Sequence, residues 1–186
     1  MLSEIQQKKI NHLFNVLDAN KNGTLQLDDF VQVSEDILQQ LSIDRHSRSG
    51  QLILIRANRL FVQLLIDTQQ PELSISLWDW MKFFDKEISS SPGETRALDS
   101  YIFRTTFHLF SLFDLNNDNQ ISVEEYSNMW SIYKIPKESC EESFDLLDKN
   151  GDLLISADEM VSGLNDFFNS SDPNAPGNLI FGKWDY

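Results

Sequence analysis

Apolar residues recur at helical spacing in a series of segments, and short polar intervals separate these segments. In the first segment Leu13, Phe14 and Leu17 share one face, and Ser3 with Gln6 has the spacing of a capping box at a helix start. The same spacing returns after each polar interval, over residues 30–37, 51–67, 77–84, 103–110 and 140–147. The pattern therefore predicts an all-α fold of helix–loop–helix units.

The segment over residues 103–110 carries an aromatic stripe. Phe103, Phe107 and Phe110 lie at spacings of four and three residues, so we expect these rings to face the core. His108 falls on a different face together with Arg104, and that face is predicted to be polar.

Three of the polar intervals repeat one rule over twelve positions. Positions 1, 3, 5 and 9 carry side-chain oxygens, position 8 is apolar, and position 12 is a carboxylate. This is the pattern of the EF-hand loop, which surrounds Ca²⁺ with roughly six to eight oxygen ligands, including the backbone carbonyl of position 7. The expected ligand positions are Asp18, Asn20, Asn22, Thr24, Gln26 and Asp29 in loop one; Asp114, Asn116, Asp118, Gln120, Ser122 and Glu125 in loop three; and Asp148, Asn150, Asp152, Leu154, Ser156 and Glu159 in loop four.

The three loops are not equivalent as calcium sites. Loops three and four each have three ligand carboxylates, whereas loop one has two and closes with Asp29, which is shorter than glutamate. A tighter shell of fewer ligands favours Mg²⁺, so we expect Mg²⁺ to compete most at loop one. Position 6 normally adopts a left-handed backbone, which Gly23 and Asn119 tolerate. In loop four this position is Leu153, which costs about 1–3 kcal/mol if the turn is kept; the alternative is a loop that bends differently.

EF-hand loops pair through a short two-stranded bridge at position 8, so loop one needs a partner. Residues 68–79, termed loop two, fit this role, with Ile75 at position 8 and Asp79 at position 12. Position 1 is Thr68 and Pro71 sits in the turn. We therefore expect loop two to keep its place in the fold but to have lost its ion, while loops three and four pair with each other.

The predicted hands divide the chain into two pairs and a tail. Residues 1–88 form the first pair, residues 89–99 a linker rich in serine with Pro92 and Gly93, and residues 100–168 the second pair. Residues 169–186 form the tail. Its first part is too rich in proline and polar residues to be helical, yet Leu179, Ile180, Phe181, Trp184 and Tyr186 follow. We expect this tail to fold back onto the body; the competing interpretation is an exposed peptide that binds a partner.

Composition restricts the partners. The 186 residues carry a formal net charge of −14, which argues against binding to nucleic acids and anionic membranes. Three bound Ca²⁺ ions would reduce this charge to −8. The apolar stretch 52–66 is too short to span a bilayer, no secretory signal is recognised, and Leu2 excludes N-myristoylation. The single cysteine, Cys140, excludes an intrachain disulfide and is expected to be a buried apolar residue. A cytoplasmic monomer is the expectation.

With its four hands and degenerate second loop, the chain resembles the long-chain EF-hand proteins, the group of sarcoplasmic calcium-binding proteins, calexcitin and calerythrin. Residues 133–147, with Ile135-Pro136 and Phe144, are similar to the approach to the fourth loop in calexcitin-type members, and residues 177–182 to their C-terminal tail. The resemblance implies one compact globule, Ca²⁺ sites in loops one, three and four, and a role in buffering or signalling.

Three classes of function differ in how well they fit this sequence. The leading hypothesis is a Ca²⁺ and Mg²⁺ buffer, with a signalling role left open; a calmodulin-like sensor is less favoured because methionine is scarce and phenylalanine abundant. The second class is a small-molecule binder related to luciferin-binding proteins. The third, an enzyme, is not expected: His12 lies beside Lys8 on a polar face, His46 lies in a polar connection, and no histidine forms a zinc or nucleophile pattern with Cys140. A protein partner remains unidentified.

Overall fold

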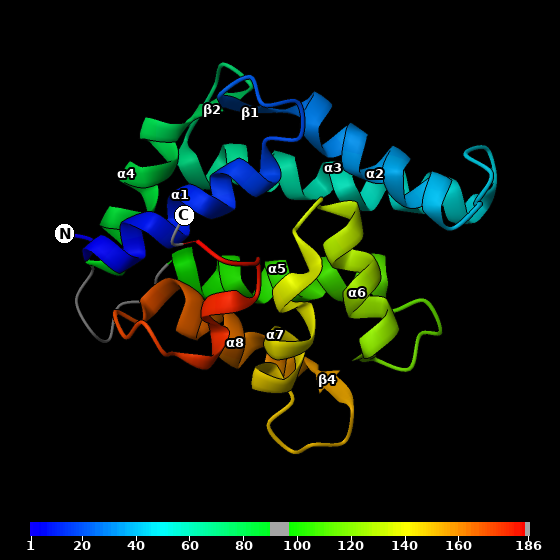
Figure 1. The fold of residues 1–186 in the computed structure, drawn as a ribbon. Helices are drawn as coiled ribbons and strands as arrows, with labels where there is room; N and C mark the ends of the chain where they lie inside the picture. The colour runs from blue at the N-terminus through cyan, green and yellow to red at the C-terminus, as the bar shows by residue number, and fades with distance from the viewer. Residues whose placement is uncertain (90–96, 185–186) are drawn as a thin grey trace.

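A computed structural model describes residues 1–89 and 97–184 of the 186-residue chain. Within these ranges the chain forms helices joined by short loops, which confirms the all-α prediction (Figure 1). The helices are α1 (Glu4–Leu17), α2 (Leu27–Gln40), α3 (Arg48–Thr68), α4 (Leu77–Ile88), α5 (Ala97–Phe113), α6 (Val123–Ile132), α7 (Cys140–Leu147) and α8 (Ala157–Asn169), with two 3-10 turns, η1 (Lys137–Ser139) and η2 (Pro176–Leu179). The predicted linker falls largely on residues 90–96, which lie outside the described residues.

Four three-residue strands join the loops in pairs. Strand β1 (Thr24–Gln26) is antiparallel to β2 (Ser74–Ser76), and β3 (Gln120–Ser122) is antiparallel to β4 (Leu154–Ser156). The central residues of each bridge occupy position 8 of their loops, where Leu25 faces Ile75 and Ile121 faces Ile155. All four of these side chains are buried. The predicted pairing of loop one with loop two, and of loop three with loop four, is confirmed.

The loops also start the helices that follow them. Ser76, Ser122 and Ser156, each at position 9 of its loop, cap α4, α6 and α8 and accept a hydrogen bond from the backbone of position 12. In return the position 12 carboxylate accepts a hydrogen bond from the backbone of position 9, which completes a capping box. The residues that would hold an ion are thus fixed at a helix start.

One hydrophobic core runs through both pairs of hands. Helix α5 lies in the middle of the molecule, in contact with α3, α4, α6 and α8 (Figure 1). Around it, the ring of Phe84 on α4 stacks on Phe168 of α8 with centroids 5.0 Å apart, and Tyr101 of α5 packs edge-on against both. Trp80 is fully buried, and its indole nitrogen donates to the carbonyl of Ile10 at 3.0 Å. The two pairs therefore stabilise each other through shared aromatic packing.

The predicted orientation of α5 was wrong. Phe103 is 71% and Phe107 69% exposed, whereas Tyr101 and Leu109 are buried. Of the three rings expected in the core, only Phe110 packs against it, and it is half-buried. His108, expected on a polar face, is buried, and burial lowers the pKa of its imidazole to about 4. The physical reason is that α5 is apolar on more than one face, so its periodicity does not select which face packs against α4 and α8.

The C-terminal tail lies against α7, α8 and the first helix. Ile180 is fully buried and Phe181 is buried. The carbonyl of Phe181 lies 2.7 Å from Nε2 of His12, so this half-buried histidine, expected on a polar face of the first helix, also contacts the tail. Burial lowers the pKa of His12. Tyr186, part of the predicted apolar tail, lies outside the described residues.

A buried lysine ties the tail to α1. The Lys9 ammonium group donates to the carbonyls of Asp166 and Ser170, at 3.2 and 2.9 Å, and to Oδ1 of Asn178 at 2.9 Å. Burial lowers the pKa of Lys9 to about 8, and the nearby Asp166 carboxylate opposes this shift. Two of the acceptors lie at the end of α8, so the lysine also compensates the negative end of that helix.

No helix in residues 1–89 and 97–184 combines the length and apolar character that a bilayer span requires. Cys140 is buried and not in a disulfide, and burial raises the pKa of its thiol.

Candidate metal centres

Loops one, three and four share one backbone path. Positions 4 and 6 both have positive φ in each of them, at Lys21 (60°) and Gly23 (83°), Asn117 (59°) and Asn119 (62°), and Gly151 (72°) and Leu153 (66°). Leu153 therefore keeps the left-handed turn, and the alternative in which loop four bends differently does not occur. A bulky residue with a Cβ, such as leucine, is strained in this conformation.

The carboxylate at position 1 organises the turn in all three loops. In loop one Asp18 accepts the backbone N–H groups of positions 5 and 6 at 3.1 and 2.8 Å. Asp114 accepts the corresponding groups at 3.2 and 3.0 Å, and Asp148 at 3.2 and 2.9 Å. The same pair of N–H groups thus points at an anionic side chain in each of the three loops.

The oxygens at positions 3 and 5 are held in the same stepwise manner. In loop three Oδ1 of Asn116 accepts the N–H of position 5 at 2.9 Å, and Oδ1 of Asp118 accepts the N–H of position 7 at 2.9 Å. Loop one repeats these two contacts at 3.0 and 2.8 Å, and loop four repeats them at 2.8 and 3.0 Å. Each side chain uses one oxygen lone pair in this way and keeps others for a cation.

The carboxylates at position 12 are buried at the foot of the loops. Besides its contact with position 9, Glu125 accepts the N–H of position 2, Leu115, at 2.8 Å, and Glu159 accepts that of Lys149 at 3.0 Å. Burial alone would raise the pKa of Glu159, but hydrogen bonds from Ser156 and from the backbone of Lys149 outweigh it, so the pKa of this carboxyl lies below its ordinary value. The residue is ionised at neutral pH.

Loop one differs at position 12 in a way that its shorter side chain explains. Asp29 accepts the N–H of Gln26, at position 9, at 2.8 Å. Its other oxygen accepts the N–H of Asn20, at position 3, at 3.2 Å, instead of the N–H of position 2. One missing methylene thus moves the carboxylate to a different part of the loop.

Loop two has a different backbone and a different set of side-chain contacts. Its positive φ angles fall at positions 2 and 6, on Gln69 and Leu73, because Pro71 occupies position 4. The Thr68 hydroxyl at position 1 donates back to the carbonyl of Leu64 at 2.7 Å. Among the described residues, the hydrogen bonds of the Asp79 carboxylate are with Ser76, its partner in the capping box.

Sequence reasoning missed one candidate oxygen in loop two. Glu72 stands at position 5, the place of a ligand in the other loops, and its side chain is exposed. Within the described residues it accepts no hydrogen bond from the loop backbone. Counting the loop positions from Thr68 is enough to identify Glu72 as a candidate ligand.

The donor chemistry of loops one, three and four fits a hard divalent cation. The ligand positions supply carboxylate, amide, hydroxyl and carbonyl oxygens, which Ca²⁺ and Mg²⁺ prefer over nitrogen and sulfur. Within the described ranges, no three Asp, Glu, His or Cys side chains gather as a metal cluster. The three ligand carboxylates of loop three, and the three of loop four, are therefore not gathered into one cluster in the described part of the chain.

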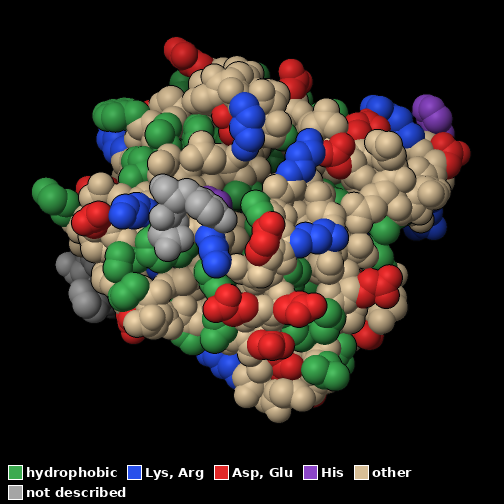
Figure 2. Space-filling view, in the orientation of Figure 1, with side chains coloured by type: hydrophobic (Ala, Val, Ile, Leu, Met, Phe, Trp, Pro, Cys, Tyr) green, Lys and Arg blue, Asp and Glu red, His purple; other side chains and the backbone are tan. Residues whose placement is uncertain are grey.

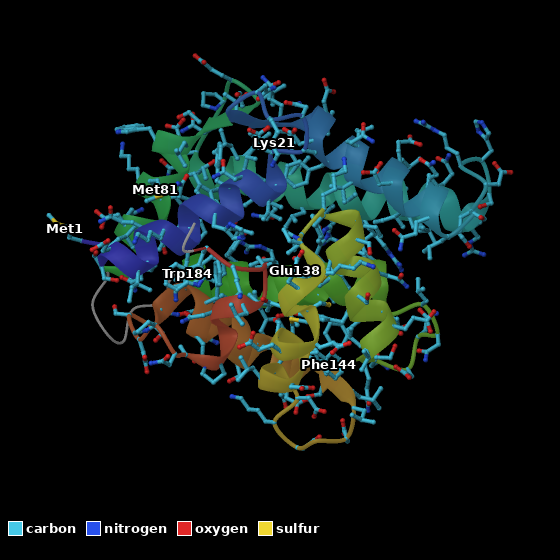
Figure 3. The ribbon with its side chains drawn as sticks, in the orientation of Figure 1. Met1, Lys21, Met81, Glu138, Phe144 and Trp184 are labelled. Carbon is cyan, nitrogen blue, oxygen red and sulfur yellow. The ribbon has the colours of Figure 1, made fainter. Side chains whose placement is uncertain are left out.

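Acidic side chains also gather outside the loops. Figure 2 shows them over the lower front of the molecule, where α7 lies in Figure 1. The exposed acids of η1 and α7 are Glu138, Glu141, Glu142 and Asp145. On the same segment Figure 3 labels Glu138, which is exposed, and Phe144, which is buried. The region carries no ligand pattern and contributes to the negative field around loop four.

Two segments of the sequence match EF-hand families. Residues 1–37 match the EF-hand domain pair, and residues 108–130 match the EF hand, so loops one and three lie inside matched segments. No curated protein matches the chain. With the paired helix–loop–helix fold, these matches define the class: the chain is an EF-hand calcium-binding protein.

The fold is that of the sarcoplasmic calcium-binding proteins and their relatives. A sarcoplasmic calcium-binding protein from amphioxus is 17% identical, with a TM-score of 0.72 over 98% of this chain and 99% of that one. The coelenterazine-binding protein from Renilla muelleri, in a calcium-loaded apo form, is 16% identical with a TM-score of 0.78 over 98% and 99%. A calcium-binding protein of Streptomyces coelicolor, described in prokaryotic calcium-mediated regulation, is 16% identical with a TM-score of 0.72 over 88% and 98%. At these identities the likeness concerns the fold alone.

Proposed function

We propose that the chain is a cytoplasmic, monomeric Ca²⁺ buffer that binds ions at loops one, three and four, while loop two serves as scaffold. The observation that carries this proposal is the threefold repetition of loop geometry. Positions 1, 3 and 5 are held by equivalent backbone hydrogen bonds, and the position 12 carboxylate accepts the N–H of position 9 in each loop. Loop two departs from this geometry at positions 1 and 4. Loop three, which combines three carboxylates with Asn119 at the strained position, is the strongest site, and Mg²⁺ competes most at loop one.

Calorimetric Ca²⁺ titration tests the site assignment. The wild-type protein is expected to bind three ions. Glu125→Gln, Glu159→Gln and Asp29→Asn should each remove one, because each replaces the carboxylate that closes a loop. Asp79→Asn is the matched control, since it changes the same position of loop two and should leave the number of ions unchanged. A loss of one ion in the control would refute the assignment of loop two.

The closed core supports a buffer over a sensor of the calmodulin type. Ile180 and Phe181 already occupy apolar surface beside α7 and α8, and Met129 and Met160 are buried. A sensor opens a methionine-rich groove when Ca²⁺ binds. Titration of the Mg²⁺-loaded protein with Ca²⁺, in the presence of anilinonaphthalene sulfonate, should leave the fluorescence of this probe of apolar surface unchanged. A sharp rise at micromolar Ca²⁺ would overturn the buffer proposal and favour a sensor.

The alternative of a luciferin-like ligand has little support inside the core. The cavity enclosed between α1, α3, α5 and the tail is about 20 Å³ and is lined by Tyr101, His108 and Tyr133 among others. This volume suits about one water molecule, whereas organic ligands occupy roughly 300–1,000 Å³. We propose no catalytic role either, since His12 and His108 are committed to packing contacts with the tail and the core.

A further inference from the structure

An apolar surface with a positive rim lies on the paired helices α3 and α5. On α3, Ile55, Val62 and Ile66 are each more than half exposed and follow one another at helical spacings of seven and four. On α5 the exposed rings of Phe103 and Phe107 lie one turn apart. The two helices pack against each other (Figure 1), and these five exposed residues are termed the α3–α5 face. Phe103 and Phe107 line the groove between the helices, and the three α3 residues lie beside it on the same helix as Arg56 and Arg59.

A groove runs between the two helices within this face. Its volume is about 260 Å³, and the rings of Phe103 and Phe107 form part of its wall. Arg56, Arg59 and Arg104 line it, and none of the lining residues described is acidic. In a chain of net charge −14, three arginines around one apolar groove are a local reversal of sign.

The arginines retain hydrogen-bonding capacity. Arg56 donates to the carbonyl of Ser111 at 2.6 Å, and Arg104 pairs with Asp67. Nε of Arg104 is buried without an acceptor, and the Arg59 guanidinium has no hydrogen bond or ion pair within the described residues. Among the described residues, Asp67 is thus the one carboxylate that pairs with any of these three guanidinium groups. His108 adds no charge at neutral pH, because burial lowers its pKa to about 4.

We propose that the α3–α5 face docks an amphipathic helix of a partner protein, with apolar side chains in the groove and acidic side chains on the arginines. The exposed seam from Ile55 to Ile66 is roughly 16 Å long, which suits about three turns of a helix. The groove is smaller than the roughly 300–1,000 Å³ of organic-ligand pockets but accommodates one or two large side chains. Charge complementarity selects acidic residues for its rim.

Two other occupants fit less well. In a symmetric dimer this face would meet its own copy, which brings guanidinium groups against guanidinium groups between two chains of charge −14. An anionic membrane would repel the chain as a whole.

Fluorescence anisotropy with two synthetic helical peptides tests the proposal on the full chain in Ca²⁺. One peptide carries leucine and tryptophan on one face, flanked by glutamates; the second has glutamines in place of the glutamates. The glutamate peptide should bind the wild type more tightly. Phe103→Ser/Phe107→Ser should weaken both peptides by about tenfold or more, because it removes the apolar anchors. Arg59→Glu should abolish the advantage of the glutamate peptide and leave the glutamine peptide nearly unchanged.

Trp78→Ser provides the matched control, since Trp78 is a large aromatic residue with 67% exposure on α4, outside the groove. It should bind both peptides as the wild type does. Because the substituted side chains are largely exposed, Ca²⁺ stoichiometry and circular dichroism should stay unchanged and report that each variant is folded. Three results would each overturn the proposal: no saturable binding to the wild type, equal binding by Phe103→Ser/Phe107→Ser, or a glutamate advantage that survives Arg59→Glu.

Discussion

The strained turn of loop four leads to a quantitative prediction for Leu153→Gly. Leu153 has φ of 66° and a side chain that is 66% exposed, so its replacement removes backbone strain while removing little packing. A residue with a Cβ in the left-handed conformation costs roughly 1–2 kcal/mol. Glycine avoids this cost but loses more conformational entropy when the loop is ordered, which offsets about 0.5–1 kcal/mol of the gain. The net gain of about 0.5–1 kcal/mol corresponds to a roughly two- to fivefold increase in affinity.

This gain should appear in calcium binding because the ion restores the turn. Without the ion, the carboxylates of Asp148, Asp152 and Glu159 repel one another, so the loop is free to relax its strain. The assay is calorimetric titration in a Glu125→Gln/Asp29→Asn background, in which loop four is the only remaining proposed site. Asn119→Gly, in the matching background with loop three intact, should change affinity less, because asparagine tolerates this conformation.

Leu73→Gly in loop two separates strain from ion binding. Leu73 has φ of 56° at the same loop position, and loop two has no proposed ion. This variant should therefore change the free energy of unfolding but not the binding of Ca²⁺. If Leu153→Gly leaves the affinity of loop four unchanged or lowers it, the strain is not coupled to the ion and the reasoning fails.

Three further predictions concern the tail and the ions. Gly177→Ala should lower the free energy of unfolding by about 1–3 kcal/mol in urea denaturation, because a Cβ there would lie 1.9 Å from the carbonyl oxygen of Gly163; an unchanged midpoint would contradict this close approach. The pKa of Lys9 is about 8 in the folded protein, below the ordinary 10.5, so the unfolded chain binds more protons between these two pH values. The free energy of unfolding of the wild type should therefore rise relative to that of Lys9→Met as the pH increases from about 8 to 10.5. Parallel profiles of this free energy against pH would count against a buried ammonium group. Ca²⁺ at about 100 times Kd should stabilise the fold by about 2.7 kcal/mol per site. The measurement is a rise in the midpoint of thermal unfolding, which a chelator should reverse. If the midpoint does not move, the ions bind the folded and unfolded chains equally well.

The sequence predicted those features that depend on neighbouring residues. The loop turns, the serine caps and the bridge at position 8 follow from twelve-residue spacing, and the left-handed position of Leu153 follows from its place in the loop. The orientation of α5 did not follow, because Tyr101 and Phe103 are equally suited to a core, and packing against α4 and α8 decides between them. Lys9 could not be identified as buried either, since its acceptors lie more than 150 residues away in the sequence.

The contacts of the tail have a consequence for the order of events during synthesis. Lys9 and His12 emerge from the ribosome about 170 residues before their partners Asn178 and Phe181. At translation rates of roughly 5–20 residues per second, α1 waits on the order of ten seconds before its last contacts become available. During that interval the apolar surface that Ile180 and Phe181 cover in the folded protein is exposed.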